Sequence, residues 1–159
     1  MLTLRKCLLW PVCALSWRAG LRIFFVYTGA QAILANPKYQ DQKMLAVFFT
    51  LQPPPRAAEH DWLLIEGFFV AGFFMAVALN LINARLSGSW LKRGWIMGSI
   101  AWMLVIPWFE FYLPYNVLRE PPALVLLESL LWFGVMLLVG LCASITLNVE
   151  FRGRTRGLV

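Results

Sequence analysis

The stretch "ALVLLESLLWFGVMLLVGLCASITL", residues 123–147, decides the class of this protein. It carries a single charged side chain, Glu128. About 20 apolar residues in helical form cross the hydrocarbon core of a bilayer, so this stretch predicts a transmembrane helix. Residues 62–84 and 94–113 repeat the pattern, because each holds one acidic residue, Glu66 or Glu110, and no basic one.

The composition agrees with several membrane spans. Hydrophobic residues make up 60% of the 159-residue chain and charged residues only 14%, and the mean hydropathy is +0.69. Average soluble proteins carry roughly 25% charged residues. A soluble chain of this size could not bury so much apolar surface. We therefore expect an all-α integral membrane protein, a four-transmembrane-helix bundle forming a single domain over residues 1–159.

One more predicted span, residues 10–35, comes first along the chain. It is long enough to cross the bilayer but contains Arg18 and Arg22. Long arginine side chains near a helix end can reach the membrane interface. Two alternatives stay open for residues 1–17, which either extend this helix or lie in the interface. Pro37 and Pro114 predict the ends of the first and third helices, because proline cannot continue a regular helix.

The segment between the first two spans, residues 36–61, holds a short apolar patch at residues 44–51. The patch is too short to span, so we expect it to lie along the membrane surface.

The distribution of basic residues predicts the orientation. Ten of the 14 Lys and Arg residues fall on the side of the termini and of the turn between the second and third spans, and four fall on the other side. Cytoplasmic loops carry the excess of Lys and Arg. This predicts cytoplasmic termini, with residues 148–159 as a cytoplasmic tail, an extracytoplasmic segment 36–61, and location in a bacterial-type inner (plasma) membrane.

Three carboxylates then share one depth. Glu66, Glu110 and Glu128 each lie within about 5 to 8 Å of the predicted outer boundary, at 1.5 Å per helical residue. Charged groups inside a bilayer are costly and usually face a protein interior or a water cavity. If they converge without a basic partner, at least one must hold a proton or all must share a cation. They are our candidates for a proton- or cation-binding site. The alternative is that they are hydrated residues marking the interface.

Glu110 and Glu128 lie on consecutive antiparallel helices and can approach each other, whereas Glu66 joins them only if its helix packs on the same side. Pro107 should kink the third helix one turn before Glu110. Polar residues expected near the same depth are the pocket neighbours Tyr27, Gln31, His60, Tyr112 and Asn116.

The pattern "GWIMG", residues 94–98, is a GxxxG element. Glycines at this spacing let helices approach closely. Gly94 and Gly98 therefore predict a tight helix contact, and they are the surface through which a homo-oligomer or a larger membrane complex could form. The bilayer itself is the other expected partner.

Several function classes lack their signatures. No basic stripe with interleaved aromatics indicates nucleic-acid binding, and no motif indicates haem, another cofactor or a Cys/His metal centre. We expect no cofactor, no metal centre and no nucleic acid. Our first hypothesis is a non-enzymatic accessory subunit or transport-like protein with an outward-facing carboxylate pocket. The alternative is a membrane enzyme acting on a lipid-like substrate, with Glu128 as acid or base and Glu66 or His60 as its partner.

Overall fold

The computed structural model describes residues 2–53 and 61–148, and in these residues all regular structure is helical. Four segments are long and apolar enough to span a membrane, as the sequence predicts: Cys7–Tyr27, Trp62–Asn83, Trp90–Val117 and Pro122–Asn148. The predicted class of an all-helical protein with four candidate membrane spans is therefore confirmed.

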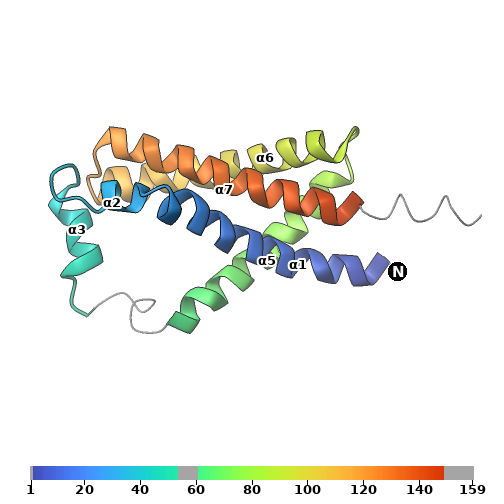
Figure 1. Ribbon diagram of the computed structural model, residues 1–159, viewed down its shortest axis with the longest axis horizontal. Helices are drawn as coiled ribbons and strands as arrows, with labels where there is room; N and C mark the ends of the chain where they lie inside the picture. Colours follow the sequence, from blue (N-terminus) through green and yellow to red (C-terminus); the bar gives the residue numbers. More distant parts are fainter. Residues whose placement is uncertain (1, 54–60, 149–159) are drawn as a thin grey trace, which may run out of the picture.

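Two of the long helices, α1 and α6, continue directly into π-helices. Their bounds are α1 Leu2–Leu21 followed by η1 Arg22–Tyr27, α5 Asp61–Asn83, α6 Trp90–Glu110 followed by η2 Phe111–Val117, and α7 Pro122–Asn148. In Figure 1, α1 and α6 run beside α7 in the opposite direction, while α5 crosses α1 and diverges along its N-terminal half. The start of α1 and the end of α7 lie at the same end of the molecule.

The contact between α6 and α7 is made backbone to backbone. A Cβ atom built on Gly140 would lie 2.5 Å from the Gly94 oxygen and 2.5 Å from the Gly98 nitrogen, and one built on Gly98 would lie 2.7 Å from the Met136 oxygen. Only glycine allows this approach. Gly94 and Gly98 thus form the predicted tight helix contact within the chain, with α7. Assembly with further copies or with a larger membrane complex stays a prediction.

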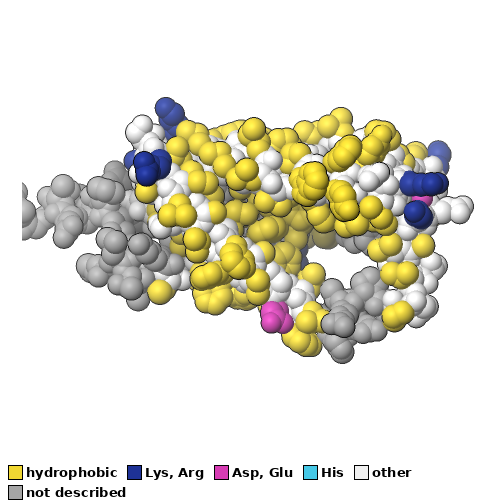
Figure 2. Space-filling model, turned by 180° about the vertical axis from the view of Figure 1, so that it is seen from behind, with side chains coloured by type: hydrophobic (Ala, Val, Ile, Leu, Met, Phe, Trp, Pro, Cys, Tyr) yellow, Lys and Arg dark blue, Asp and Glu magenta, His cyan; other side chains and the backbone are white. Residues whose placement is uncertain are grey.

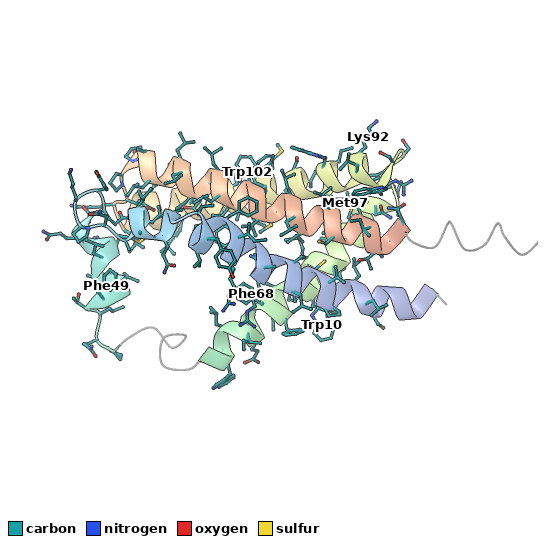
Figure 3. The ribbon with its side chains drawn as sticks, in the orientation of Figure 1. Trp10, Phe49, Phe68, Lys92, Met97 and Trp102 are labelled. Atoms are coloured by element: carbon teal, nitrogen blue, oxygen red, sulfur yellow. The ribbon has the colours of Figure 1, made fainter. Side chains whose placement is uncertain are left out.

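The helix α1 packs on both α7 and α5. A Cβ on Gly72 of α5 would lie 2.8 Å from the Ala14 Cβ, and one on Gly20 would lie 2.9 Å from the Val135 Cγ1. The Trp10 indole, between α1 and α5 in Figure 3, donates a hydrogen bond of 2.6 Å to the Phe69 carbonyl oxygen. The buried core is mostly small or flexible. Its fully buried apolar members among the described residues are Leu9, Cys13, Leu79, Met97, Val135, Met136, Val139 and Ala143.

Large hydrophobic side chains are exposed on the outside of the long helices. Leu104 is 72% exposed, Phe74 67% and Met103 66%. Figure 2 shows Lys and Arg side chains near the two ends of one face, with hydrophobic side chains over the length between them. An apolar belt of this kind is unfavourable in water and matches the hydrocarbon core of a bilayer.

The first helix differs from its predicted bounds, residues 10–35. It begins at Leu2 and ends at Tyr27, so residues 2–17 extend the helix. Gly29 adopts a left-handed backbone with φ 75°, which glycine tolerates and which stops the helix. A separate short helix, α2 Ala30–Leu34, follows it.

The third helix also continues beyond its predicted end. Pro114 does not stop it, because the chain has changed to a π-helix at Phe111 and continues to Val117. Prolines inside helices are tolerated where the α-helical ladder is locally abandoned, and π-turns are such places. Pro107, one turn before Glu110, lies inside α6.

The segment after α2 forms one more short helix, α3 Gln42–Phe49, over the predicted apolar patch. It lies at the end of the molecule where α7 begins, at a steep angle to the long helices (Figure 1). Its position at a membrane surface stays a prediction. The residues 54–60 and the predicted tail after Asn148 lie outside the described part of the chain.

The α6–α7 contact yields a stability prediction. Gly140→Ala should lower the free energy of unfolding in detergent by about 1–3 kcal/mol, because the added methyl group overlaps the α6 backbone. Gly67→Ala is the matched control, since a Cβ there meets nothing within 4 Å. The control should be neutral or slightly stabilising, because alanine is the better helix former. Thermal or denaturant unfolding would measure both, and equal effects would contradict the proposed contact.

Candidate functional site

Three glutamates meet at the hairpin that joins α6 to α7. Glu110 is the last residue of α6, Glu120 lies in the turn and Glu128 lies in α7. One carboxylate oxygen of each lies within 4.8 Å of one from each of the others. We call these three residues the carboxylate cluster. Glu128 follows Pro122 by six residues, so the cluster lies about 9 Å along the helix axis from the start of α7.

The turn between the helices folds Glu120 back over η2. The Leu118 amide donates to the Leu113 carbonyl at 2.9 Å, and the Glu120 amide donates to the Pro114 carbonyl at 2.9 Å. Arg119 between them adopts φ 59°, an uncommon backbone conformation for a residue other than glycine. Pro121 and Pro122 follow at once and fix the start of α7. The chain reversal thus directs the Glu120 side chain inward.

The cluster is buried and short of hydrogen-bond donors. Glu110 is 2% exposed and Glu120 is 1% exposed, while Glu128 is half-buried. Both Glu110 oxygens and the Glu120 Oε2 accept no hydrogen bond from the described residues. No Lys or Arg in the described part of the chain forms an ion pair with the three carboxylates. Buried charges without partners are costly, so the cluster needs a positive counterpart.

Among the described residues, Gln40 is the one polar side chain outside the hairpin that donates a hydrogen bond to the cluster. It is 6% exposed, and its Nε2 donates to the Glu120 Oε1 at 2.7 Å and to the Leu34 carbonyl at 3.1 Å. Its own Oε1 accepts from the Asp41 amide at 2.9 Å. The Gln40 amide is therefore fully bonded, and it fixes one oxygen of Glu120 while leaving the other facing the cluster.

A second contact holds the same segment to the hairpin. The Lys43 Nζ donates to the Val117 carbonyl at the end of η2, at 3.2 Å. Carbonyl groups at a helix C-terminus lack intrahelical partners, and a cation there is favourable. The Asp41 carboxylate meanwhile caps α3 by accepting from the Lys43 amide at 2.8 Å. Residues 40–43 thus cover the hairpin at the cluster.

Aromatic side chains form the floor of the site. Trp132, one turn after Glu128, lies beside Glu110 and packs edge to face on Phe25 of η1 with ring centroids 5.3 Å apart. Trp102 lies between α6 and α7 (Figure 3), and its indole donates to the Ser129 carbonyl at 2.9 Å. Trp132 thus places apolar ring surface beside the Glu110 carboxylate.

Burial also acts on Glu120, which lies outside the spans. It raises the pKa of the Glu120 carboxyl group above its ordinary value, and the hydrogen bond from Gln40 opposes that rise. Burial is the larger cause. A neutral or cation-bound Glu120 is thereby favoured over a free carboxylate.

The structure brings two of the three predicted site glutamates together and leaves the third apart from them. Glu110 and Glu128 come together, with Glu120 between their helices. Glu66 is exposed on α5 and does not belong to the group. The reason is the packing of α5, whose main partner is α1 rather than the α6–α7 hairpin, and whose N-terminal half diverges (Figure 1).

The predicted pocket neighbours that the structure describes lie at exposed positions. Tyr27, Gln31, Tyr112 and Asn116 are all exposed. Tyr112 stacks on Trp108 with ring centroids 5.6 Å apart, at the outer surface of the helix. This position fits the aromatic anchors found at membrane interfaces. His60 lies outside the described residues.

Glu120 and Gln40 were not predicted from the sequence. Glu120 follows Arg119 and precedes two prolines, so it resembles a hydrated loop residue. Gln40 belongs to a polar stretch far from the hairpin, and no pattern links the two across 80 positions. One feature of the sequence could have indicated Glu120. It lies about midway between Glu110 and Glu128, in the short connection between their helices.

Comparison with protein-family models, with curated proteins and with solved structures found no match to this chain. The function must therefore be argued from the site.

The Gln40 contacts yield a second prediction. Gln40→Leu should lower the free energy of unfolding by about 1–3 kcal/mol, because it removes hydrogen bonds to a buried carboxylate and a buried carbonyl. Gln31→Leu, an exposed position on α2, is the control and should change it by no more than about 0.5 kcal/mol. Thermal unfolding in one detergent would measure both variants. An unchanged Gln40→Leu protein would show that the segment is not held by this contact.

Proposed function

We propose that this chain is a small, non-enzymatic multi-pass membrane protein that binds a proton or a cation at the carboxylate cluster, in a transport-like or accessory role. The observation that carries the proposal is the meeting of two buried carboxylates and one half-buried carboxylate without a basic partner among the described residues. Like charges at this separation in a poorly solvated site cannot all stay ionised and unpaired. A site that must take up positive charge is suited to binding it and releasing it.

The cluster also has the depth that such a role requires. It lies one to two turns inside the start of α7, under the segment that carries Gln40. A proton or cation can reach it from one face of the membrane without crossing the apolar middle. The distribution of basic residues, ten against four, assigns that face to the outside of a bacterial-type plasma membrane and the termini to the cytoplasm.

The enzyme alternative is less well supported by the geometry. Of its two proposed partners for Glu128, Glu66 is exposed on a diverging helix and His60 lies outside the described residues. A groove of about 430 Å³ at the same end of α6 and α7 has an apolar lining that includes Pro107, Phe111 and Tyr115 but none of the three glutamates. This groove therefore does not bring a lipid-like substrate to the carboxylates.

Infrared difference spectroscopy with labelled glutamate tests the proposal. At neutral pH the cluster should contain a protonated carboxyl group or a cation-bound carboxylate, and Glu128→Gln should abolish that signal while leaving folding nearly intact. Glu66→Gln is the control and should leave it unchanged. Titration of all three carboxylates near the ordinary glutamate value of about 4.3, without any cation effect, would refute the proposal.

The orientation is tested separately by reporter fusions. A reporter after Val159 should be read on the cytoplasmic side, and one inserted at Gln42 on the external side, because ten of 14 basic residues fall on the side of the termini. A control fusion in the turn at Gly88, on the same side as the termini, should match the Val159 fusion. The reversed pattern would place the cluster at the cytoplasmic boundary.

A further inference from the structure

We propose that the carboxylate cluster binds one hard divalent cation, of the class of Mg²⁺, Mn²⁺ and Ca²⁺. Glu110, Glu120 and Glu128 each supply one oxygen, and Gln40 is a positioning residue that orients Glu120. This inference rests on the proposed function, because it names the ligand of the same cluster. It is carried by the spacing of the oxygens, by their lack of other partners and by the contacts of Gln40.

The spacing of the oxygens fits a single ion. Hard divalent cations hold oxygen ligands at about 2.1 to 2.5 Å. Two ligands on opposite sides of such an ion are then about 4.2 to 5 Å apart, and two adjacent ligands about 3.0 to 3.5 Å apart. The three carboxylate oxygens lie within 4.8 Å of one another, so no pair is farther apart than two ligands on opposite sides of a Ca²⁺ ion. Three ligands cannot all lie opposite one another, so the carboxylates must close slightly around an ion, and most around the smaller Mg²⁺ and Mn²⁺.

The ligand atoms are also free to bind. Glu110 is only 2% exposed, yet neither of its carboxylate oxygens accepts a hydrogen bond from the described residues. Glu120 is 1% exposed, and its Oε2 likewise accepts no hydrogen bond from the described residues. Leaving buried acceptors unsatisfied is costly, and a cation would satisfy one oxygen of Glu110 and the Oε2 of Glu120 at once. This is independent of the spacing and points to a positively charged ligand.

The chemistry of the ligands selects the class of cation. All three are carboxylates, and the group contains no cysteine or histidine. Thiolate and imidazole ligands favour zinc and copper, whereas carboxylates suit magnesium, calcium and manganese. A divalent ion balances two of the three negative charges, which leaves one for a single proton.

Gln40 supplies the support that a metal ligand requires. Its amide holds the Glu120 Oε1 at 2.7 Å, so the other oxygen, Oε2, is the one left for the ion. The Leu34 carbonyl and the Asp41 amide fix the Gln40 side chain in turn. Partners of this kind orient metal ligands, and losing one typically costs 10- to 100-fold in affinity.

Binding of Mn²⁺ to the full-length protein in detergent, after chelator treatment, tests the inference. Electron paramagnetic resonance of unbound Mn²⁺ should show one saturable site per chain, with Mg²⁺ and Ca²⁺ competing. Glu110→Gln, Glu120→Gln and Glu128→Gln should each raise the Kd by at least about 100-fold, and Gln40→Leu by about 10- to 100-fold with the stoichiometry unchanged. Glu66→Gln, an exposed carboxylate outside the cluster, is the matched control and should leave the Kd unchanged.

The melting temperature gives a second test, which distinguishes cation binding by the glutamates from a purely structural role. In chelator, Glu128→Gln should melt at the same temperature as the wild type or higher, because it removes one of three like charges. Added Mn²⁺ should raise the melting temperature of the wild type and leave that of the variant unchanged. If the variants fold poorly, a Mn²⁺-induced change in the carboxylate bands of glutamate-labelled wild type replaces this comparison.

The outcomes separate this inference from the function on which it rests. Saturable binding that survives in all three Gln variants would place the cation elsewhere and overturn the inference. Absence of saturable binding, with a protonated carboxyl group in the cluster at neutral pH, would overturn the inference and leave the proposed function standing. Carboxylates that titrate near 4.3 and bind no cation would overturn both.

Discussion

The backbone contact between Gly140 of α7 and the pair Gly94 and Gly98 of α6 is the constraint on which the rest of the structure depends. A Cβ on Gly140 would come within 2.5 Å of the α6 backbone, so the two helices approach as closely as helices can. That approach fixes the register of the hairpin. Because the register is fixed, Glu110 near the end of α6 and Glu128 near the start of α7 come to face one another. The backbone hydrogen bonds of the turn fold Glu120 back over η2, which brings it to the other two glutamates.

The carboxylate cluster differs from isolated acidic residues near the end of a membrane span because its side chains lie together and two of them are buried. Isolated acids there are hydrated by the headgroup region and tell little about function. Here Glu110 and Glu120 are almost fully buried, aromatic rings lie on the inner side, and the described residues provide one amide donor, from Gln40. The fold therefore concentrates acidic groups that the described residues do not neutralise. Natural proteins tolerate such an arrangement where it serves a ligand or a transferred ion.

Departures from regular helix geometry surround the same region. The π-helix η2 begins directly after Glu110 and ends at the turn that contains Glu120. The π-helix η1 supplies Phe25, which packs on Trp132 beside Glu110. π-Turns are rare and occur often at functional sites. Their wider turns change the direction of side chains without ending the helix, which lets one continuous helix both span and shape a site.

The sequence by itself determined the class of the protein. Twenty or more apolar residues with a single charge require a helix in a bilayer, because no other structure of that length satisfies its backbone groups there. The four spans, the tight contact at Gly94 and Gly98, and the candidacy of Glu110 and Glu128 all followed from composition and spacing. These are local properties, and a local pattern is sufficient to predict them.

Only the tertiary structure decided which acids meet. Glu66, Glu110 and Glu128 share one predicted depth, and the sequence left open whether Glu66 joins the other two. In the structure α5 packs on α1 and its glutamate is left exposed, while α6 and α7 bring the other two together. Glu120 and Gln40 lie 80 positions apart and are joined by one hydrogen bond of 2.7 Å. Residue type and helix depth fix where a side chain lies along the membrane normal. Its position around the helix axis and the identity of its neighbours depend on helix–helix packing, which no single segment encodes.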